Sequence, residues 1–170
     1  MKTKKQETNY MKRVLKLSAF VVAGLIVLVV VLQLIPVWAL KTNPSVIAEP
    51  KWDSPETRAL AQRACFDCHS NETVWPWYSN VAPVSWLVIL DTVRGRNALN
   101  FSDWGTSEAE LSEIDNLIRE GEMPPATYLL THPNAGLTDA EKQQLIDGLS
   151  KTVRAGVGGG EGNEQQEGGG

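Results

Sequence analysis

The stretch Cys65-Phe66-Asp67-Cys68-His69 decides how the rest of the chain is interpreted. Its C-x-x-C-H spacing lets two thiols add to the two vinyl groups of a haem while the neighbouring imidazole ligates the iron from one face. Cys65 and Cys68 are the only cysteines in the sequence. The motif therefore predicts one covalently attached haem c, held by Cys65 and Cys68, with His69 as the proximal iron ligand.

Three other interpretations of the cysteine pair carry less weight. A structural zinc site needs four ligands, and Cys65, Cys68, His69 and His132 are the one set available. In that set the adjacent Cys68 and His69 are poorly placed to reach one tetrahedral ion. A thioredoxin-like dithiol requires alternating strand and helix patterns around the motif, and none is visible. A structural disulfide between the two cysteines is the plainest alternative to haem attachment.

The first forty residues read as a membrane or export signal. Leu17 to Leu40 is a run of 24 residues without a charge, compared with the roughly 20 apolar residues that a spanning helix needs. Six basic residues precede it in segment 1–16, which the positive-inside rule keeps in the cytoplasm. We expect a retained single-pass anchor over 17–40 in the bacterial inner membrane, with the C-terminal part in the periplasm. Cleavage near Val37-Trp38-Ala39, as in a signal peptide, is the alternative.

Charge is unevenly distributed along the chain. Of 16 basic and 20 acidic residues, six basic and one acidic lie before Lys41, which leaves a net charge of −9 on the remainder. An acidic exported part repels nucleic acid, so no nucleic-acid partner is expected. We interpret most of the acidic excess as solubilising.

The exported part divides by composition into three segments. Residues 41–53, with Pro44 and Pro50, predict an extended linker. Residues 54–155 are left for one small domain, whose core is marginal unless a covalently held haem supplies apolar interior. An unloaded protein is therefore expected to fold poorly. Residues 156–170 are rich in glycine and glutamate and predict a disordered tail.

Local signals inside residues 54–155 are helical. Ser54-Pro55 is an N-cap followed by proline at the first helical position, and capping boxes begin at Ser107 and Thr138. The helix after Ser107 has four apolar residues on one side and ends at Gly121; the helix after Thr138 ends near Gly156. A shorter helix is predicted from Trp86 to Val93, with Ser85 as its N-cap. No alternating strand pattern is visible, so the predicted class is all-α.

Two residues compete for the second axial position on the iron. Met123 is the sole methionine outside the first forty residues and lies in a proline-stiffened loop, Gly121-Glu122-Met123-Pro124-Pro125. His132, in Thr131-His132-Pro133, is the rival ligand. We favour Met123; an open sixth site is the third possibility.

Aromatic and basic residues between positions 75 and 96 are further candidates for binding the cofactor. Trp75, Trp77 and Tyr78 are expected to exclude water from the haem edge and to bond its propionates. Packing into a small core is their simpler role. Arg94 and Arg96 are candidates for pairing with the propionates, since guanidinium matches carboxylate geometry. Either can equally be a solvated surface charge.

Several blocks of sequence carry a family resemblance. They are Cys65 to Thr73, Trp75 to Ser79, Ala82 to Trp86, Gly95-Arg96 with Asn100 to Ser102, Gly121 to Pro125, Tyr128, His132 and Leu137-Thr138. From about Ser54 to Val153 the chain resembles the bacterial haem-binding domain family. The resemblance implies a small monohaem domain, exported to the periplasm. The order of helix, motif, methionine loop and terminal helix is also similar to class I cytochromes c, which implies a cytochrome c-like helical fold.

These observations predict a membrane-anchored periplasmic monohaem c-type cytochrome that passes single electrons between redox partner proteins. With both axial positions filled the chain is an electron carrier rather than an enzyme. A haem-based sensor is the alternative, although a cytoplasmic segment of about sixteen residues offers no output domain. A peroxidase-like role requires an open sixth site and a general base, for which His132 is the one candidate.

Overall fold

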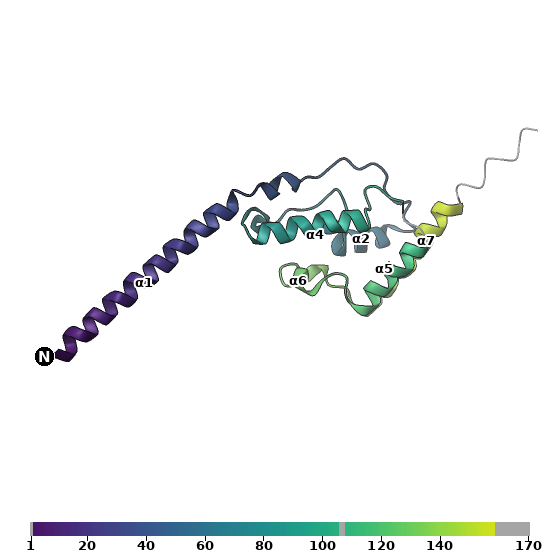
Figure 1. Cartoon of the computed structure of the whole chain (residues 1–170). Coiled ribbons are helices and arrows are strands. Elements are labelled where there is room, and N and C mark those ends of the chain that lie inside the picture. The colour runs from purple at the N-terminus through teal and green to yellow at the C-terminus, as the bar shows by residue number, and fades with distance from the viewer. Residues whose placement is uncertain (1, 106–107, 159–170) are drawn as a thin grey trace, which may run out of the picture. The chain divides into compact units, whose positions relative to one another are not determined.

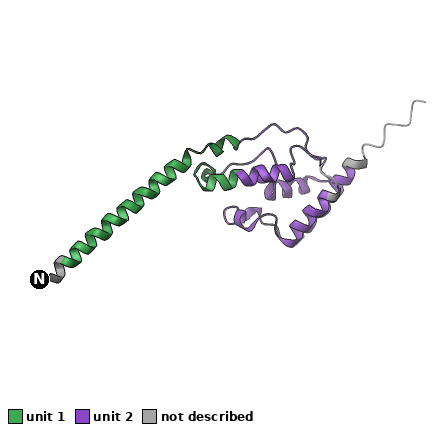
Figure 2. Ribbon diagram, viewed as in Figure 1, with its two compact units in different colours: residues 1–41, 76–89 green, residues 42–75, 90–170 purple. Residues whose placement is uncertain are grey.

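The computed structural model describes residues 2–105 and 108–158, and its regular elements are helices (Figure 1). Across these ranges no strand is present, and a single bridge joins Ala48 to Asp103. The predicted all-α class is therefore confirmed. The chain forms two compact units, residues 1–41 with 76–89 and residues 42–75 with 90–170 (Figure 2). Each unit is described by itself below.

The first unit contains the segment for which an anchor is predicted. Helix α1 (Lys2–Gln33) is followed by a 3-10 turn, η1 (Pro36–Leu40). Between Gln6 and Leu40 the helix is long and apolar enough to cross a membrane, by length and composition. Regular helix ends at Gln33 because Pro36 lacks an N–H and its ring would clash with the carbonyl four residues earlier.

The rest of this unit is a second 3-10 turn, η2 (Trp77–Asn80), and the start of α4 (Val84–Ala98). The prediction of a helix from Trp86 to Val93 capped by Ser85 is wrong at both ends. The helix begins directly after Pro83, which places Ser85 inside its first turn. The helix also continues beyond its predicted end at Val93, through Gly95 to Ala98.

The second unit holds the remaining helices. They are α2 (Pro55–Ala64), α3 (Phe66–His69), α5 (Glu108–Glu120), α6 (Ala126–Leu129), η3 (Pro133–Ala135) and α7 (Asp139–Gly158). The predicted cap of α2 is confirmed, since Ser54 Oγ accepts from the Thr57 N–H at 3.2 Å. The capping box of α7 is confirmed in both directions between Thr138 and Glu141. The proposed cap Ser107 and the tail from residue 159 lie outside the described residues.

The core of this unit forms where α7 packs against both α2 and α5. The predicted faces of α5 and α7 point inward, with these residues buried: Leu111, Ile118, Leu145, Ile146, Leu149 and Val153. An aromatic group extends the core, because Phe101 lies 5.4 Å from both Phe66 and Trp52 between ring centroids. Phe66 belongs to the C-x-x-C-H motif, so the motif is anchored in the core.

The predicted linker is extended but is held against the second unit. The Ile47 and Ala48 N–H groups donate to Ser102 O at 2.8 and 3.1 Å, and Asn71 Nδ2 donates to Ser45 O at 2.9 Å. Residues 42–53 are thus part of the folded unit. The linker prediction from composition contained no sign of these long-range bonds.

Candidate haem site

The two cysteines lie one helical turn apart at the junction of α2 and α3. Cys65 ends α2, and its carbonyl accepts from the N–H groups of Cys68 at 3.1 Å and His69 at 2.9 Å. Both thiols are free and half-buried, so the alternative disulfide is not formed. A single turn of helix therefore presents two thiols and one imidazole from five consecutive residues.

Burial governs the acidity of both thiols. It raises the pKa of Cys65 to about 12, assisted by the neighbouring Cys68. Burial, followed by the charges of Asp67 and Asp91, raises the pKa of Cys68 to about 11. Both side chains are therefore protonated thiols at neutral pH.

The imidazole of His69 is oriented by a backbone carbonyl. Its Nδ1 lies 3.1 Å from Leu99 O, so the neutral ring donates from Nδ1 and keeps its lone pair on Nε2. Burial lowers the pKa of His69, and bonds to the Leu99 and Gly95 carbonyls partly oppose that effect. A carbonyl partner on one nitrogen is the arrangement that directs the other nitrogen at a metal.

Gly95 allows α4 to approach the motif. A Cβ placed on this glycine would lie 2.5 Å from Cys68 O and 3.0 Å from Cys68 C, both backbone atoms that cannot move cheaply. The close approach brings Leu99 O within reach of His69. In the sequence, Gly95 stands out as part of the family resemblance. A glycine inside an otherwise helical stretch is the signal that indicates such a close approach.

Asp67, between the two cysteines, ties the motif to two other segments. Its Oδ2 accepts from Tyr128 Oη at 2.7 Å, and its Oδ1 accepts from the Val74 N–H at 2.9 Å. Its backbone carbonyl accepts from Thr73 Oγ1 at 2.8 Å. The bond to Tyr128 joins the motif to the loop that contains the two candidate sixth ligands. No pattern in the sequence indicated a role for Asp67.

The expected ligand Met123 lies just beyond α5. Gly121 adopts φ 76°, and the N–H groups of Glu122 and Met123 both donate to Leu117 O, at 2.9 and 3.1 Å. Met123 is half-buried and the following Pro124 is buried. These two bonds fix the backbone of Met123 at the end of α5.

The rival ligand His132 stacks on Tyr128, with ring centroids 4.1 Å apart and planes inclined by 12°. Its Nδ1 lies 3.0 Å from Thr131 Oγ1. Tyr128 therefore contacts both His132 and the motif residue Asp67. Both candidate ligands thus belong to the segment that the Tyr128 bond secures.

The two arginines predicted to pair with the propionates, Arg94 and Arg96, differ in burial: Arg94 is exposed and Arg96 is half-buried. Arg96 uses four of its five N–H donors on the protein: Ser70 O, Thr42 O, Asn43 Oδ1 and Thr73 Oγ1, at 2.7 to 3.0 Å. Burial lowers its pKa. Its bonds hold the linker, which leaves propionate pairing as a prediction for its last N–H and for the exposed Arg94.

The three aromatic residues predicted to exclude water from the haem edge belong to different units. Trp75 donates from Nε1 to Asn43 Oδ1 at 3.1 Å within the second unit. Trp77 and Tyr78 belong to the first unit, where their rings meet edge to face at 5.8 Å. Contact of these aromatic residues with haem stays a prediction.

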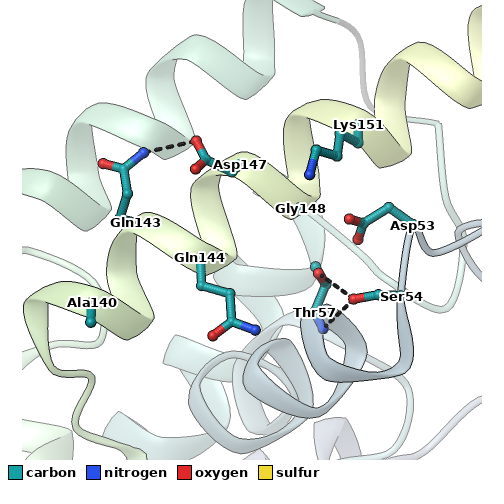
Figure 3. Close-up of a pocket in the computed structure, with 9 residues that line it drawn as sticks. All are labelled: Asp53, Ser54, Thr57, Ala140, Gln143, Gln144, Asp147, Gly148 and Lys151. Atoms are coloured by element: carbon teal, nitrogen blue, oxygen red, sulfur yellow. Dashed lines mark hydrogen bonds between the residues drawn. The ribbon is translucent and has the colours of Figure 1, made fainter.

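Metal-ligand chemistry without haem finds no support within residues 2–105 and 108–158. No three side chains of His, Cys, Asp and Glu are grouped there to hold an ion, so the zinc set with His132 is not assembled. A cavity of about 620 Å³ lies where α7 crosses α2, with polar residues such as Gln143, Gln144 and Asp147 along it (Figure 3). None of the predicted site residues lines this cavity.

The helical fold and the C-x-x-C-H turn define a haem-binding class of protein. The sequence model of the haem-binding domain family matches residues 27–151, and the chain belongs to this family. No curated protein and no solved structure matches the chain. Its residues fit the cofactor, because two free thiols and an imidazole with a directed Nε2 lie on one helical turn.

Proposed function

We propose that the chain is a membrane-anchored, periplasm-facing monohaem c-type cytochrome that transfers single electrons. One observation carries this proposal: the Nδ1 bond to Leu99 O leaves the lone pair of His69 on Nε2, on the same helical turn that holds both thiols. Bound haem supplies a one-electron couple at its iron. The proposal takes the anchor from α1, whose length and composition suit a membrane span.

Each residue of the site has a defined task in this proposal. Cys65 and Cys68 would hold the haem through two thioethers, each formed by addition of an S–H across a vinyl C=C bond with no atom lost. His69 and Met123 would supply the two side-chain ligands of the iron. A thioether favours the reduced form relative to a second imidazole, and a closed site excludes small-molecule substrates.

The optical spectrum of the full haem-loaded chain in detergent tests the proposal. We expect a low-spin spectrum in both oxidation states that is unchanged by carbon monoxide, and a haem that acid–acetone does not extract. A high-spin spectrum with rapid carbon monoxide binding would instead indicate a sensor or a peroxidase-associated domain. Extractable haem would contradict covalent attachment.

Substitution of Met123 tests the sixth ligand. Met123→Ala is expected to convert the spectrum to high spin and to lower the reduction potential, since the iron loses its thioether ligand. His132→Ala is the matched control in the same loop and should leave the spectrum low spin. The reverse pattern would transfer the role to His132.

A further inference from the structure

The end of the anchor is bonded to a segment far along the chain, within the first compact unit (Figure 2). Gln33 Nε2 donates to Asn80 O at 3.1 Å, and Gln33 Oε1 accepts from the Ala82 N–H at 2.5 Å. Lys41 Nζ also donates to Asn80 Oδ1 at 2.7 Å. These bonds form a junction between residues 33–41 and 79–82, beside which lies a small cavity of about 40 Å³. The amide of Gln33 therefore holds residues 76–89 at the end of α1.

Apart from Lys41, the residues around this junction are apolar or uncharged. Neither Pro76 to Leu90 nor Gln33 to Leu40 contains a charged residue. Trp77 is 77% exposed and Leu87 is 65% exposed. The other exposed apolar side chains of this surface are Leu34, Ile35, Trp38, Leu40, Val81 and Val84. Large apolar side chains gathered in this way mark a contact with lipid or protein.

The depth of the junction favours lipid. The uncharged helix from Leu17 to Leu32 rises roughly 24 Å at 1.5 Å per residue, close to the roughly 30 Å of hydrocarbon in a bilayer. Gln33 would then lie near the outer boundary of the hydrocarbon, and the loop bonded to it would lie at headgroup depth. Exposed tryptophans, here Trp38 and Trp77, are typical of that depth.

We propose that Trp77, Val81, Val84 and Leu87 form, with the end of the anchor, a membrane-contact surface that enters the interfacial region of the periplasmic leaflet. The chain would then be attached to the bilayer at two places in its sequence, the anchor and residues 76–89. This inference rests on the membrane anchor of the proposed function. The partner is the lipid itself, contacted by apolar burial without headgroup charge pairing.

Spin labels on the full haem-loaded chain in phosphatidylethanolamine and phosphatidylglycerol vesicles test the surface. Labels are placed by Leu87→Cys and Val84→Cys in the surface, by Leu25→Cys in the anchor, and by Asn97→Cys as an exposed control on α4. Collision with oxygen, which concentrates in lipid, is compared with collision with a water-soluble nickel chelate. We expect the oxygen-to-nickel ratio at Leu87 and Val84 to exceed that at Asn97 severalfold.

The four positions separate failure of this inference from failure of the anchor. A lipid signature at Leu25 with a water signature at Leu87 and Val84 would overturn the contact surface and leave the anchor intact. A water signature at Leu25 as well would overturn the anchor on which it rests. Shielding of Leu87 and Val84 from both reagents, with dipolar broadening, would assign the surface to a second copy of the chain and overturn lipid contact.

Discussion

A single hydrogen bond, from Tyr128 Oη to Asp67 Oδ2, joins segment 121–132 to the haem motif. Tyr128→Phe removes the donor to Asp67 Oδ2 and leaves a carboxylate oxygen without that partner. A bond to a charged group contributes about 1.5 kcal/mol, so we expect a loss of that size in the free energy of unfolding. Thermal unfolding of the haem-loaded chain in detergent, followed by haem absorbance, measures it.

A double-mutant cycle with Asp67→Asn isolates this bond. Asp67→Asn leaves one side-chain oxygen where the tyrosine hydroxyl and the Val74 N–H each need an acceptor. The double variant should therefore cost less than the sum of the single variants. Strictly additive costs would show that the hydroxyl and the carboxylate do not interact in the folded protein.

The carboxyl group of Asp115 in α5 should make the free energy of unfolding depend on pH. Its Oδ1 is buried and, among the described residues, has no hydrogen-bond partner. Burial raises the pKa of Asp115, Asp147 raises it further, and Arg119 opposes both. Because the folded-state pKa is above the unfolded value, stability is greatest below the unfolded pKa and falls as pH rises through the folded pKa. The ionised carboxylate is therefore destabilising at neutral pH.

Asp115→Asn should remove this penalty. We expect a gain of about 0.5 kcal/mol in the free energy of unfolding at pH 7, because the site is only partly buried. The gain should shrink towards pH 3, where the aspartate is protonated in both states. Glu113→Gln, an exposed change on the same helix, is the control. Equal gains from both variants at pH 7 would attribute the effect to net charge alone.

At the scale of elements, the contact between α4 and α3 depends on one missing side chain. Gly95→Ala would gain helix propensity of about 1 kcal/mol, but its Cβ would meet the backbone of Cys68. Overpacking typically costs about 1–3 kcal/mol, so the net effect is a displaced helix and a longer bond between His69 and Leu99 O. We expect less haem per chain, measured as the pyridine haemochrome.

Gly105→Ala is the matched control for this change, because a Cβ there meets no atom within 4 Å. Its haem content should equal that of the unsubstituted chain. Normal loading in Gly95→Ala would show that α4 does not need this close approach. Reduced loading in both variants would point to a general effect of the added methyl groups.

Elements with local signals could be predicted from the sequence, and elements fixed by distant contacts could not. The caps at Ser54 and Thr138 depend on residues three positions away and were predicted correctly. The contact of α4 with the backbone of Cys68 at Gly95 is a tertiary contact, which no local pattern contains. Arg96 likewise bonds residues 26 and 54 positions away, so its role in holding the linker was not visible.

The same distinction between local signals and distant contacts applies to the site residues. The C-x-x-C-H spacing alone indicated two thiols and an imidazole on one turn, because its five residues are consecutive. The carbonyl that orients His69 comes from Leu99, 30 positions away. Tyr128 is 61 positions from Asp67. Composition could propose Met123 and His132 as ligands, but the bond that secures their loop is a tertiary contact.

For the whole molecule, the unit around the motif combines a well-buried core with segments that bury few side chains. Residues of α2, α5 and α7 bury one another, including Leu60, Leu145 and Leu149. Helix α6, in contrast, has no buried residue. Without attached haem, α2, α5 and α7 should therefore persist while the loop 121–132 and the end of α4 lose order. This refines the expectation of a poorly folded unloaded protein.

The variant Cys65→Ala/Cys68→Ala, which cannot attach haem, tests this division by hydrogen exchange of the full chain. Amides of residues 90–98 and 121–132 should exchange at least tenfold faster than in the loaded chain, since a population shift of about 1.4 kcal/mol gives that factor. Amides of α7 should change less. Met123→Ala, which retains both thioethers, is the control and should protect residues 90–98. Uniform loss of protection would mean that haem organises the entire unit, and unchanged protection would mean that the fold is complete without it.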